Sequence, residues 1–358
     1  MPVLRRRMER CDARPARPRH LALGLRMLRR RAIAARCCSA AADRGYSLRR
    51  MRPGDLPRVR AKSGNSFVKS ADFDIIDAQI HQPAPVVPFG DDVPEQVKLA
   101  VNVELAREAM DSAGVDATLV VAALPYIDAC VTRYPERFIG VETFMAKGAE
   151  LAAAVERARD DKRVIAGRLL VTDFRTTELS ESFTSGAMDA GFEAAEKVGL
   201  PLFLSTHGQA AAMRPLIERH PELIVIIDHV GVSQHPVSPP RDDPWDRLDG
   251  LLSLAEFANV SVKLCGLPLL SDQAYPFADV WPNLDRVLAA FGPERLMWAS
   301  DYTRLRMAVA GGPMRNRGCL YSESRDMLLY SDRIDRDAKA AIFGGTVKRL
   351  LGWQPSAG

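Results

Sequence analysis

Short runs of apolar, mostly β-branched residues alternate with amphipathic stretches along the chain from Phe73 onward. Continuous apolar runs bounded by turns are typical of strands that are buried on both faces of a parallel sheet. Eight strands that alternate with helices in one chain predict an α/β fold of the closed (β/α)8 barrel type. The eight runs lie at 73–81, 117–124, 138–144, 164–171, 200–207, 222–229, 260–266 and 295–301.

Several of the stretches between these runs have the periodicity of helices. The stretch VELAREAMDSAGV leads to Gly114, which predicts a helix that has this glycine as its C-cap. Residues 324–353 predict a helical tail that Gly344 and Gly345 interrupt.

Polar residues follow the predicted strands at the point where each strand ends. In a barrel of this kind the carboxyl ends of all strands meet at one mouth, where barrel enzymes carry out their chemistry. Three of the six histidines fall at such ends, whereas His20, His220 and His235 do not. The residues at the strand ends are Asp77, Gln79, His81, Arg168, His207, Asp228, His229, Lys263 and Asp301.

Each of these three histidines, taken alone, has the ordinary explanation of a buried or surface side chain. Taken together, His81, His207 and His229 can surround one cavity with Asp301, because their strands deliver all four to the same rim. Clustered titratable groups of this kind support general acid–base catalysis or metal binding.

Charge divides the 358-residue chain into two unlike parts. Residues 1–70 hold 20 basic and 4 acidic residues, a net charge of +16, whereas residues 71–358 hold 29 and 41, a net charge of −12. The first part is rich in Arg, Ala and Pro and lacks apolar periodicity, so we predict a disordered extension before a barrel domain at 71–358. Arg26 and the arginines at 29–31 interrupt its only apolar stretch, which argues against a secretory signal.

Three interpretations of this extension stay open. Its excess of Arg fits an organellar transit peptide, and its charge also suits an arm that binds nucleic acid or an anionic membrane. The favoured interpretation is a dispensable segment, encoded by GC-rich DNA upstream of a true start at Met51. The charge therefore gives no reason to expect a nucleic-acid partner.

The cysteines are not spaced as in a disulfide framework or a metal finger. No run approaches the roughly 18 apolar residues of a membrane-spanning helix. We therefore predict a cytoplasmic protein with a small-molecule substrate and no membrane partner, and leave a homo-oligomer open.

Several strand motifs resemble the amidohydrolase superfamily, and within it the amidohydrolase-related group that includes 2-pyrone-4,6-dicarboxylate lactonase and several nonoxidative decarboxylases. IIDAQIH resembles the strand 1 signature Ile-Asp-x-His-x-His, and PERLMWASDY resembles the strand 8 segment with the central acid or base. VIAGRLL, LPLFLSTH, IVIIDHVG and NVSVKLCG resemble strands 4 to 7. The likeness covers residues 73–353.

The chain departs from this family pattern at four positions. Gln79 stands in place of the first His of the strand 1 signature, and Arg168 stands where metal-dependent members carry a bridging Lys or a Glu. Cys265 replaces the usual Ser, and Thr346 stands where Asn is common. A binuclear metal centre is therefore not expected.

A metal-free site is the favoured interpretation, because Gln is a poor zinc ligand compared with imidazole. The alternative is one divalent ion, zinc or manganese, held by His81, His207 and Asp301. The carbonyl group of Gln79 would assist in that case.

The resemblance implies a hydrolase that acts on a small carboxylated lactone or a related ester. Asp301 would activate water, with a pKa raised by burial if the pocket is dry. The catalytic set would be completed by His207, His229, His81 and Gln79, in which the histidines polarise the substrate carbonyl.

Two cations are expected to bind a substrate carboxylate, since a guanidinium matches it bidentately. They are Arg168 and, with less support, Lys263. The alternatives are internal ion pairs of Arg168 with Asp77 and of Lys263 with Asp301.

Two other functions stay open beside the hydrolase. One is a metal-dependent nonoxidative decarboxylase of the same superfamily, and the other is a barrel that binds a small acid without turning it over. The substrate itself depends on the long loops at 82–99, 230–244 and 302–321. The arginines of the last loop could attract an anionic substrate, but a solvated face is the commoner arrangement and the one we expect. They are Arg304, Arg306, Arg315 and Arg317.

Overall fold

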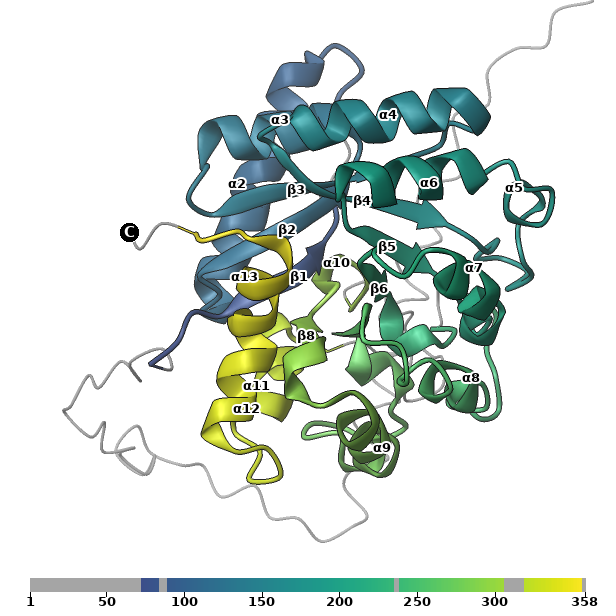
Figure 1. Cartoon of the computed structure of the whole chain (residues 1–358). Helices are drawn as coiled ribbons and strands as arrows, with labels where there is room; N and C mark the ends of the chain where they lie inside the picture. Colours follow the sequence, from purple (N-terminus) through teal and green to yellow (C-terminus); the bar gives the residue numbers. More distant parts are fainter. Residues whose placement is uncertain (1–71, 84–88, 235–237, 306–318, 356–358) are drawn as a thin grey trace, which may run out of the picture. The chain divides into compact units, whose positions relative to one another are not determined.

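The computed structural model describes residues 72–83, 89–234, 238–305 and 319–355. Within them, eight parallel strands form one sheet whose neighbours follow the chain order (Figure 1). The strands are β1 (Ile76–Ile80), β2 (Ala117–Ala122), β3 (Phe138–Thr143), β4 (Val164–Leu170), β5 (Leu202–Ser205), β6 (Val225–Ile227), β7 (Val260–Cys265) and β8 (Leu296–Ala299). Each lies inside one of the eight predicted runs, which confirms the (β/α)8 barrel. The predictions for residues 1–70, including a start at Met51, lie outside the described residues.

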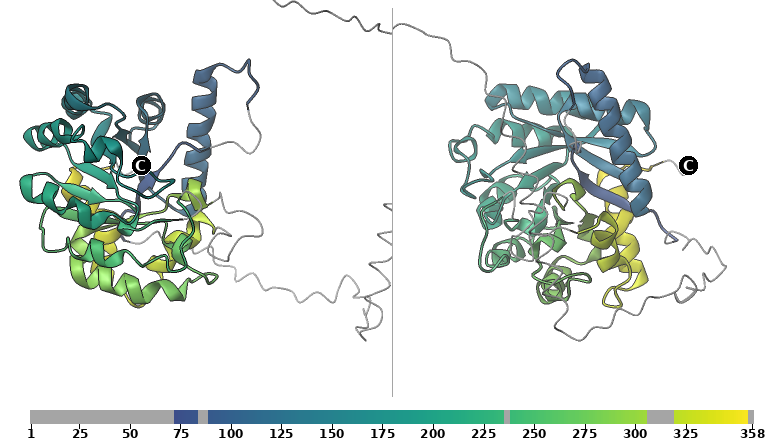
Figure 2. Two further views of the ribbon diagram at one scale, coloured as in Figure 1. Left: turned by 90° about the vertical axis from the view of Figure 1, so that its right-hand side faces the viewer. Right: turned by 180° about the vertical axis from the view of Figure 1, so that it is seen from behind.

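Helices surround the strands, as the turned views also show (Figure 2). The α-helices are α2 (Glu95–Ala113), α3 (Leu124–Arg133), α4 (Gly148–Asp160), α5 (Glu181–Thr184), α6 (Asp189–Val198), α7 (Arg214–Arg219), α8 (Leu248–Leu252), α9 (Trp281–Phe291), α10 (Tyr302–Leu305), α11 (Tyr321–Leu329), α12 (Arg336–Ala340) and α13 (Thr346–Leu351). Short 3-10 turns are η1 (Ala210–Met213), η2 (His229–Gly231), η3 (Leu267–Leu270), η4 (Ala278–Val280) and η5 (Pro293–Arg295). In the part of the chain that these elements cover, every helix is too short or too polar to cross a bilayer.

Apolar side chains pack in two layers around the strands. The outer layer joins strands to helices and includes Ile127 and Phe192. The inner layer fills the barrel and includes Leu119, Phe203 and Met297, all of them fully buried. The polar side chains at the strand ends therefore lie above a packed apolar interior.

The barrel closes between β1 and β8 through main-chain and side-chain hydrogen bonds. The amide of Asp301 donates to the carbonyl oxygen of Gln79 at 3.1 Å. The amide of Ser300 donates to Asp77 Oδ1 at 2.9 Å, and the Tyr321 hydroxyl donates to Asp77 Oδ2 at 2.6 Å. Asp77 is fully buried. It therefore joins the first strand to the last instead of facing the mouth.

A β-bulge in β1 lies next to Gln79. The pairing with β2 advances from Asp77 to Ile80 on one strand and from Thr118 to Val120 on the other, so β1 carries one extra residue. Bulges turn side chains out of the regular alternation and are common beside active sites. Here the bulge accompanies a Gln side chain that enters the mouth.

The tail packs against the first half of the barrel. The guanidinium of Arg325 on α11 donates to the carbonyl oxygen of Ala113, the last residue of α2. Gly114 has a φ of 63° and ends α2, as predicted. The predicted interruption at Gly344 is a π turn (η7, Ala341–Gly345) between α12 and α13. A Cβ at this glycine would approach the carbonyl oxygen of Asp74 to 2.7 Å, so only Gly allows the close packing.

Candidate active site

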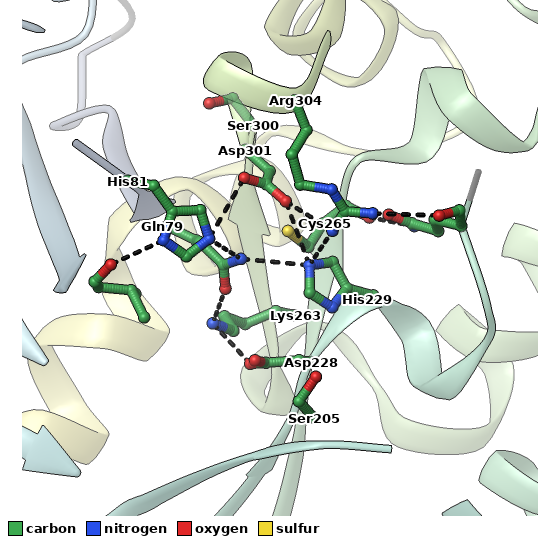
Figure 3. Close-up of polar contacts among 12 residues, drawn as sticks. Gln79, His81, Ser205, Asp228, His229, Lys263, Cys265, Ser300, Asp301 and Arg304 are labelled. Carbon is green, nitrogen blue, oxygen red and sulfur yellow. Dashed lines mark hydrogen bonds and ion pairs between the residues drawn. The ribbon is translucent and has the colours of Figure 1, made fainter. Parts of the chain in front are cut away.

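Asp301 lies at the centre of a buried polar cluster at the barrel mouth (Figure 3). Its Oδ2 accepts a hydrogen bond of 2.8 Å from Arg304 Nη1 and lies 3.2 Å from His229 Nε2. Its Oδ1 lies 3.5 Å from His81 Nε2 and has no hydrogen-bond partner among the described residues. One carboxylate oxygen is thus fully engaged, and the other is left for a ligand or water.

The carboxyl group of Asp301 is held in its ionised form. Burial alone would raise its pKa, but the positive charge of Arg304 together with the interactions of His81 and His229 outweighs burial and holds the pKa well below its ordinary value. The expectation of a raised pKa is therefore wrong. That expectation took account of burial but not of Arg304, which lies three residues further along the chain.

Three of the expected site residues have left-handed backbone conformations just after their strands. The φ angles are 37° at His207, 55° at His229 and 51° at Asp301. Residues other than Gly seldom adopt such angles, and exceptions concentrate at functional sites. The shared turn directs side chains from β5, β6 and β8 toward one mouth.

Gln79 donates hydrogen bonds to two histidines. Lys263 Nζ donates to Gln79 Oε1, which fixes the orientation of the amide group. The amide nitrogen then lies 3.2 Å from His81 Nε2 and 3.1 Å from His229 Nε2, with one N–H for each (Figure 3). His81 Nδ1 in turn donates to the Val121 carbonyl at 2.7 Å. Both histidines therefore carry their proton on Nδ1 and accept at Nε2.

Lys263, Asp228 and Arg168 form a buried ion triad below this cluster. Lys263 Nζ lies 2.6 Å from Asp228 Oδ1, and Arg168 Nε donates to Asp228 Oδ2 at 2.7 Å. Burial would raise the pKa of Asp228, but the two cations together hold it below its ordinary value. The alternative ion pairs of Arg168 with Asp77 and of Lys263 with Asp301 are therefore wrong.

The two expected carboxylate-binding cations differ in accessibility. Lys263 is fully buried, with its ammonium group 4.1 Å from the ring centre of Phe203. It lies beneath Gln79 and has no exposed surface from which to contact a substrate. Arg168 uses Nε for Asp228, and its two Nη groups have no hydrogen-bond partner among the described residues. Arg168 thus keeps donors for a ligand, whereas Lys263 positions Gln79.

His207 belongs to a neighbouring part of the mouth. The Thr172 hydroxyl donates to the Ser205 carbonyl at 2.9 Å and therefore accepts from His207 Nδ1 at 2.7 Å. The His207 ring stacks on His229 with a centroid distance of 6.2 Å, and it has no recorded contact with Asp301 among the described residues. A cavity of about 250 Å³ adjoins it, lined also by Thr177, Gly208, Gln209, Arg241 and Arg247. The structure thus does not place His207 beside the ligand atoms of His81 and Asp301.

Sequence reasoning missed the part that Arg304 plays in the site. We expected a solvated loop, but Arg304 is only 7% exposed and lies on α10. That expectation is wrong. The available signal was its spacing of three residues from Asp301, which places the two side chains on one face of a helical turn. Arg306, Arg315 and Arg317 lie outside the described residues.

A candidate metal site overlaps the cluster. Ligand atoms of His229, Cys265 and Asp301 lie within 4.8 Å of one another. However, Arg304 Nη1 already donates to both His229 Nε2 and Asp301 Oδ2. Burial also raises the pKa of Cys265 well above its ordinary value, so it is a thiol and not a thiolate ligand. In this arrangement the donor set does not fit a divalent ion.

Comparison with known proteins identifies a family. A family model described as amidohydrolase matches residues 76–353. An L-fucono-1,5-lactonase of Burkholderia ambifaria is 30% identical over 145 residues, which are 40% of this chain and 46% of the relative. The chain thus spans less than half the length of this curated relative.

Solved structures share the fold at low sequence identity. An amidohydrolase from Burkholderia multivorans with bound zinc has a TM-score of 0.57 and 18% identity, covering 78% of this chain and 100% of that one. A Pseudomonas putida protein proposed to be a 2-pyrone-4,6-dicarboxylic acid hydrolase has a TM-score of 0.54 and 19% identity, covering 78% and 98%. At these identities the structures support the barrel fold alone.

A (β/α)8 barrel with a buried acid, histidines and cations at its carboxyl-terminal mouth defines a barrel enzyme. The match over residues 76–353 shows that the chain belongs to the amidohydrolase family. The resemblance seen in the strand motifs is thereby confirmed.

Proposed function

We propose that this protein hydrolyses a small carboxylated lactone or a related ester. The observation that carries the proposal is the buried, ionised Asp301, whose Oδ1 lacks a hydrogen-bond partner among the described residues and lies 3.5 Å from His81 Nε2. A water molecule bound there would have a proton acceptor on the side away from the substrate. The partial match to a lactonase adds support for the substrate class.

In the proposed reaction a water oxygen forms a bond to the lactone carbonyl carbon while Asp301 Oδ1 accepts the water proton. The carbon–oxygen bond of the ring then breaks, and the leaving alkoxide takes a proton from the Asp301–His81 pair. The products are a hydroxyl group and a carboxylic acid on one molecule, and the acid then loses its proton to solvent to give the carboxylate. No oxidant, reductant or second substrate is needed.

The charge that develops on the carbonyl oxygen needs hydrogen-bond donors. Neutral His81, His207 and His229 carry their protons on Nδ1 in this hydrogen-bond arrangement, so their Nε2 atoms accept. We therefore assign stabilisation of the oxyanion to Arg304, whose buried Nε has no hydrogen-bond partner among the described residues. The decarboxylase alternative has less support, because it requires a metal ion to hold the substrate carboxylate.

The experiment is a hydrolysis assay on a panel of lactones, with and without a carboxylate, that compares wild type with Arg168→Met. Wild type should hydrolyse the carboxylated compounds best. Losing charge-assisted hydrogen bonds to a carboxylate should raise KM for them by about 10- to 100-fold and leave uncarboxylated lactones nearly unchanged.

Arg219→Met is the matched control, since this arginine is exposed at the end of α7, which leads into the amino-terminal end of β6 and not into the mouth. An unchanged KM in Arg168→Met for the best carboxylated substrate would show that Arg168 is not the anchor. Absence of hydrolysis across the panel would contradict the lactonase proposal itself.

The pH profile of hydrolysis should have its acidic limb far below the ordinary pKa of histidine, 6.5. Burial, reinforced by Arg304, lowers the pKa of His229 to about 4 and that of His207 to about 3. Protonating His229 would place a hydrogen on Nε2 against the Arg304 donor 2.7 Å away. We expect kcat/KM to stay constant down to about pH 6 and to fall only toward pH 4.

Steady-state rates in overlapping buffers measure this profile, with circular dichroism at each pH to confirm that the protein stays folded. An acidic limb with its midpoint near 6.5 would mean that the active-site histidines titrate as in water, which the buried arrangement does not allow.

A further inference from the structure

The guanidinium of Arg304 lies among hydrogen-bond acceptors of the cluster, where a bound metal ion could otherwise lie. Its Nη1 lies 2.8 Å from Asp301 Oδ2 and 2.7 Å from His229 Nε2, and its Nη2 donates to the Gln234 carbonyl at 3.3 Å (Figure 3). Three acceptors thus converge on one guanidinium: one follows β8, one lies in the turn after β6 and one lies in the loop after that turn. The side chain has little freedom to leave, because it is buried on the short helix α10.

Two of these acceptors come from residues that could hold a divalent ion. His229, Cys265 and Asp301 could each offer one ligand atom to such an ion, and Arg304 Nη1 contacts His229 Nε2 and Asp301 Oδ2. A guanidinium is charged at every pH at which the protein is folded, so it cannot yield these lone pairs by losing a proton. A metal ion at the same atoms would lie in direct contact with a second positive charge.

The His81 side of the cluster is closed to a metal ion by a different donor. Lys263 holds the carbonyl oxygen of Gln79, so the amide N–H groups face His81 Nε2 and His229 Nε2. The oxygen that could coordinate a metal ion faces away from both histidines. Hydrogen-bond donors therefore cover every imidazole lone pair beside Asp301.

We propose that Arg304 is a built-in cation that excludes a divalent metal ion from this site and takes over its charge. The guanidinium neutralises Asp301 Oδ2 and leaves Oδ1 free, as a metal ion bound at Oδ2 would. The exclusion of metal does not depend on the substrate. Its use in activating water rests on the proposed lactone hydrolysis.

The test measures zinc binding in the tag-free full-length protein, without any substrate. Wild type, Arg304→Met and Arg304→Gln are equilibrated with Zn²⁺, freed of unbound ion by gel filtration and analysed for zinc per chain. Affinity is measured by competition with a chromophoric chelator. Arg333→Met is the matched control, because this arginine is exposed and pairs with Asp285 at the surface.

Wild type and Arg333→Met should retain less than about 0.1 equivalent of zinc. Arg304→Met should bind zinc with at least about 100-fold higher affinity, because the guanidinium no longer occupies His229 Nε2 and Asp301 Oδ2 and a bound ion can displace the thiol proton of Cys265. Adding Asp301→Asn to Arg304→Met should abolish the gained site. Arg304→Gln keeps a hydrogen-bond donor without the charge and should bind zinc with intermediate affinity. This variant tests the proposal if Arg304→Met does not fold.

Wild type that retains about one equivalent of zinc would overturn the proposal. So would folded Arg304→Met and Arg304→Gln proteins that bind no more zinc than wild type. Neither result bears on lactone hydrolysis, and an inactive lactone panel would leave the zinc measurements unaffected, so the two failures are distinguishable.

Discussion

Asp301→Asn should lower kcat/KM for lactone hydrolysis by about 10²- to 10⁴-fold, the usual contribution of a positioned general base. Asn has nearly the same shape and tolerates the φ of 51° at this position better than most residues. Its amide oxygen can still accept a hydrogen bond from Arg304. The variant should therefore lose proton transfer while keeping the arrangement of the mouth.

Steady-state kinetics on the best lactone of the panel give the rate, and thermal unfolding gives the stability of each variant. Asp160→Asn is the matched control, because this aspartate is exposed at the end of α4. Normal activity in a folded Asp301→Asn protein would remove the assignment of the base.

Lys263→Met should lower the free energy of unfolding by about 3–5 kcal/mol, the usual cost of removing one partner of a buried ion pair. Both Lys263 and Asp228 are buried, with 2.6 Å between their charged atoms. The substitution also removes the donor that fixes the amide of Gln79. Activity should therefore fall together with stability.

Urea unfolding of Lys263→Met, Asp228→Asn and the double variant measures this coupling, and exposed Lys162→Met serves as the control. Asp228→Asn leaves two cations without their shared partner, so the double variant should be more stable than Asp228→Asn alone. A double variant that is less stable, or a Lys263→Met protein as stable as wild type, would contradict the structural role of the triad.

The strand ends show how far sequence reasoning extends in this protein. His81, His229 and Asp301 were predicted to share the mouth, and each of the two imidazoles lies within 3.5 Å of the Asp301 carboxylate. His207 was placed at the same mouth but forms its hydrogen bond with Thr172. Strand order predicts the rim that a residue reaches, but it does not predict the neighbours that the residue contacts there.

Asp77 and Arg304 are the two residues whose place in the site was predicted wrongly. The first was expected at the mouth and joins β1 to β8, while the second was expected in solvent and lies buried beside Asp301. In both cases the partner comes from a distant strand or a short helical turn. A pattern of apolar and polar positions contains no information on such contacts.

The sequence by itself determined the eight strands, their order around the barrel and the meeting of His81, His229 and Asp301 at the mouth. These features follow from periodicity and topology, which are local or generic properties of the chain. Only the tertiary structure decided which charges pair, which nitrogen of each histidine carries the proton and which cation faces Asp301. Those outcomes depend on separations of about 3 Å between side chains from different strands, because hydrogen bonds and ion pairs lose their strength beyond that range.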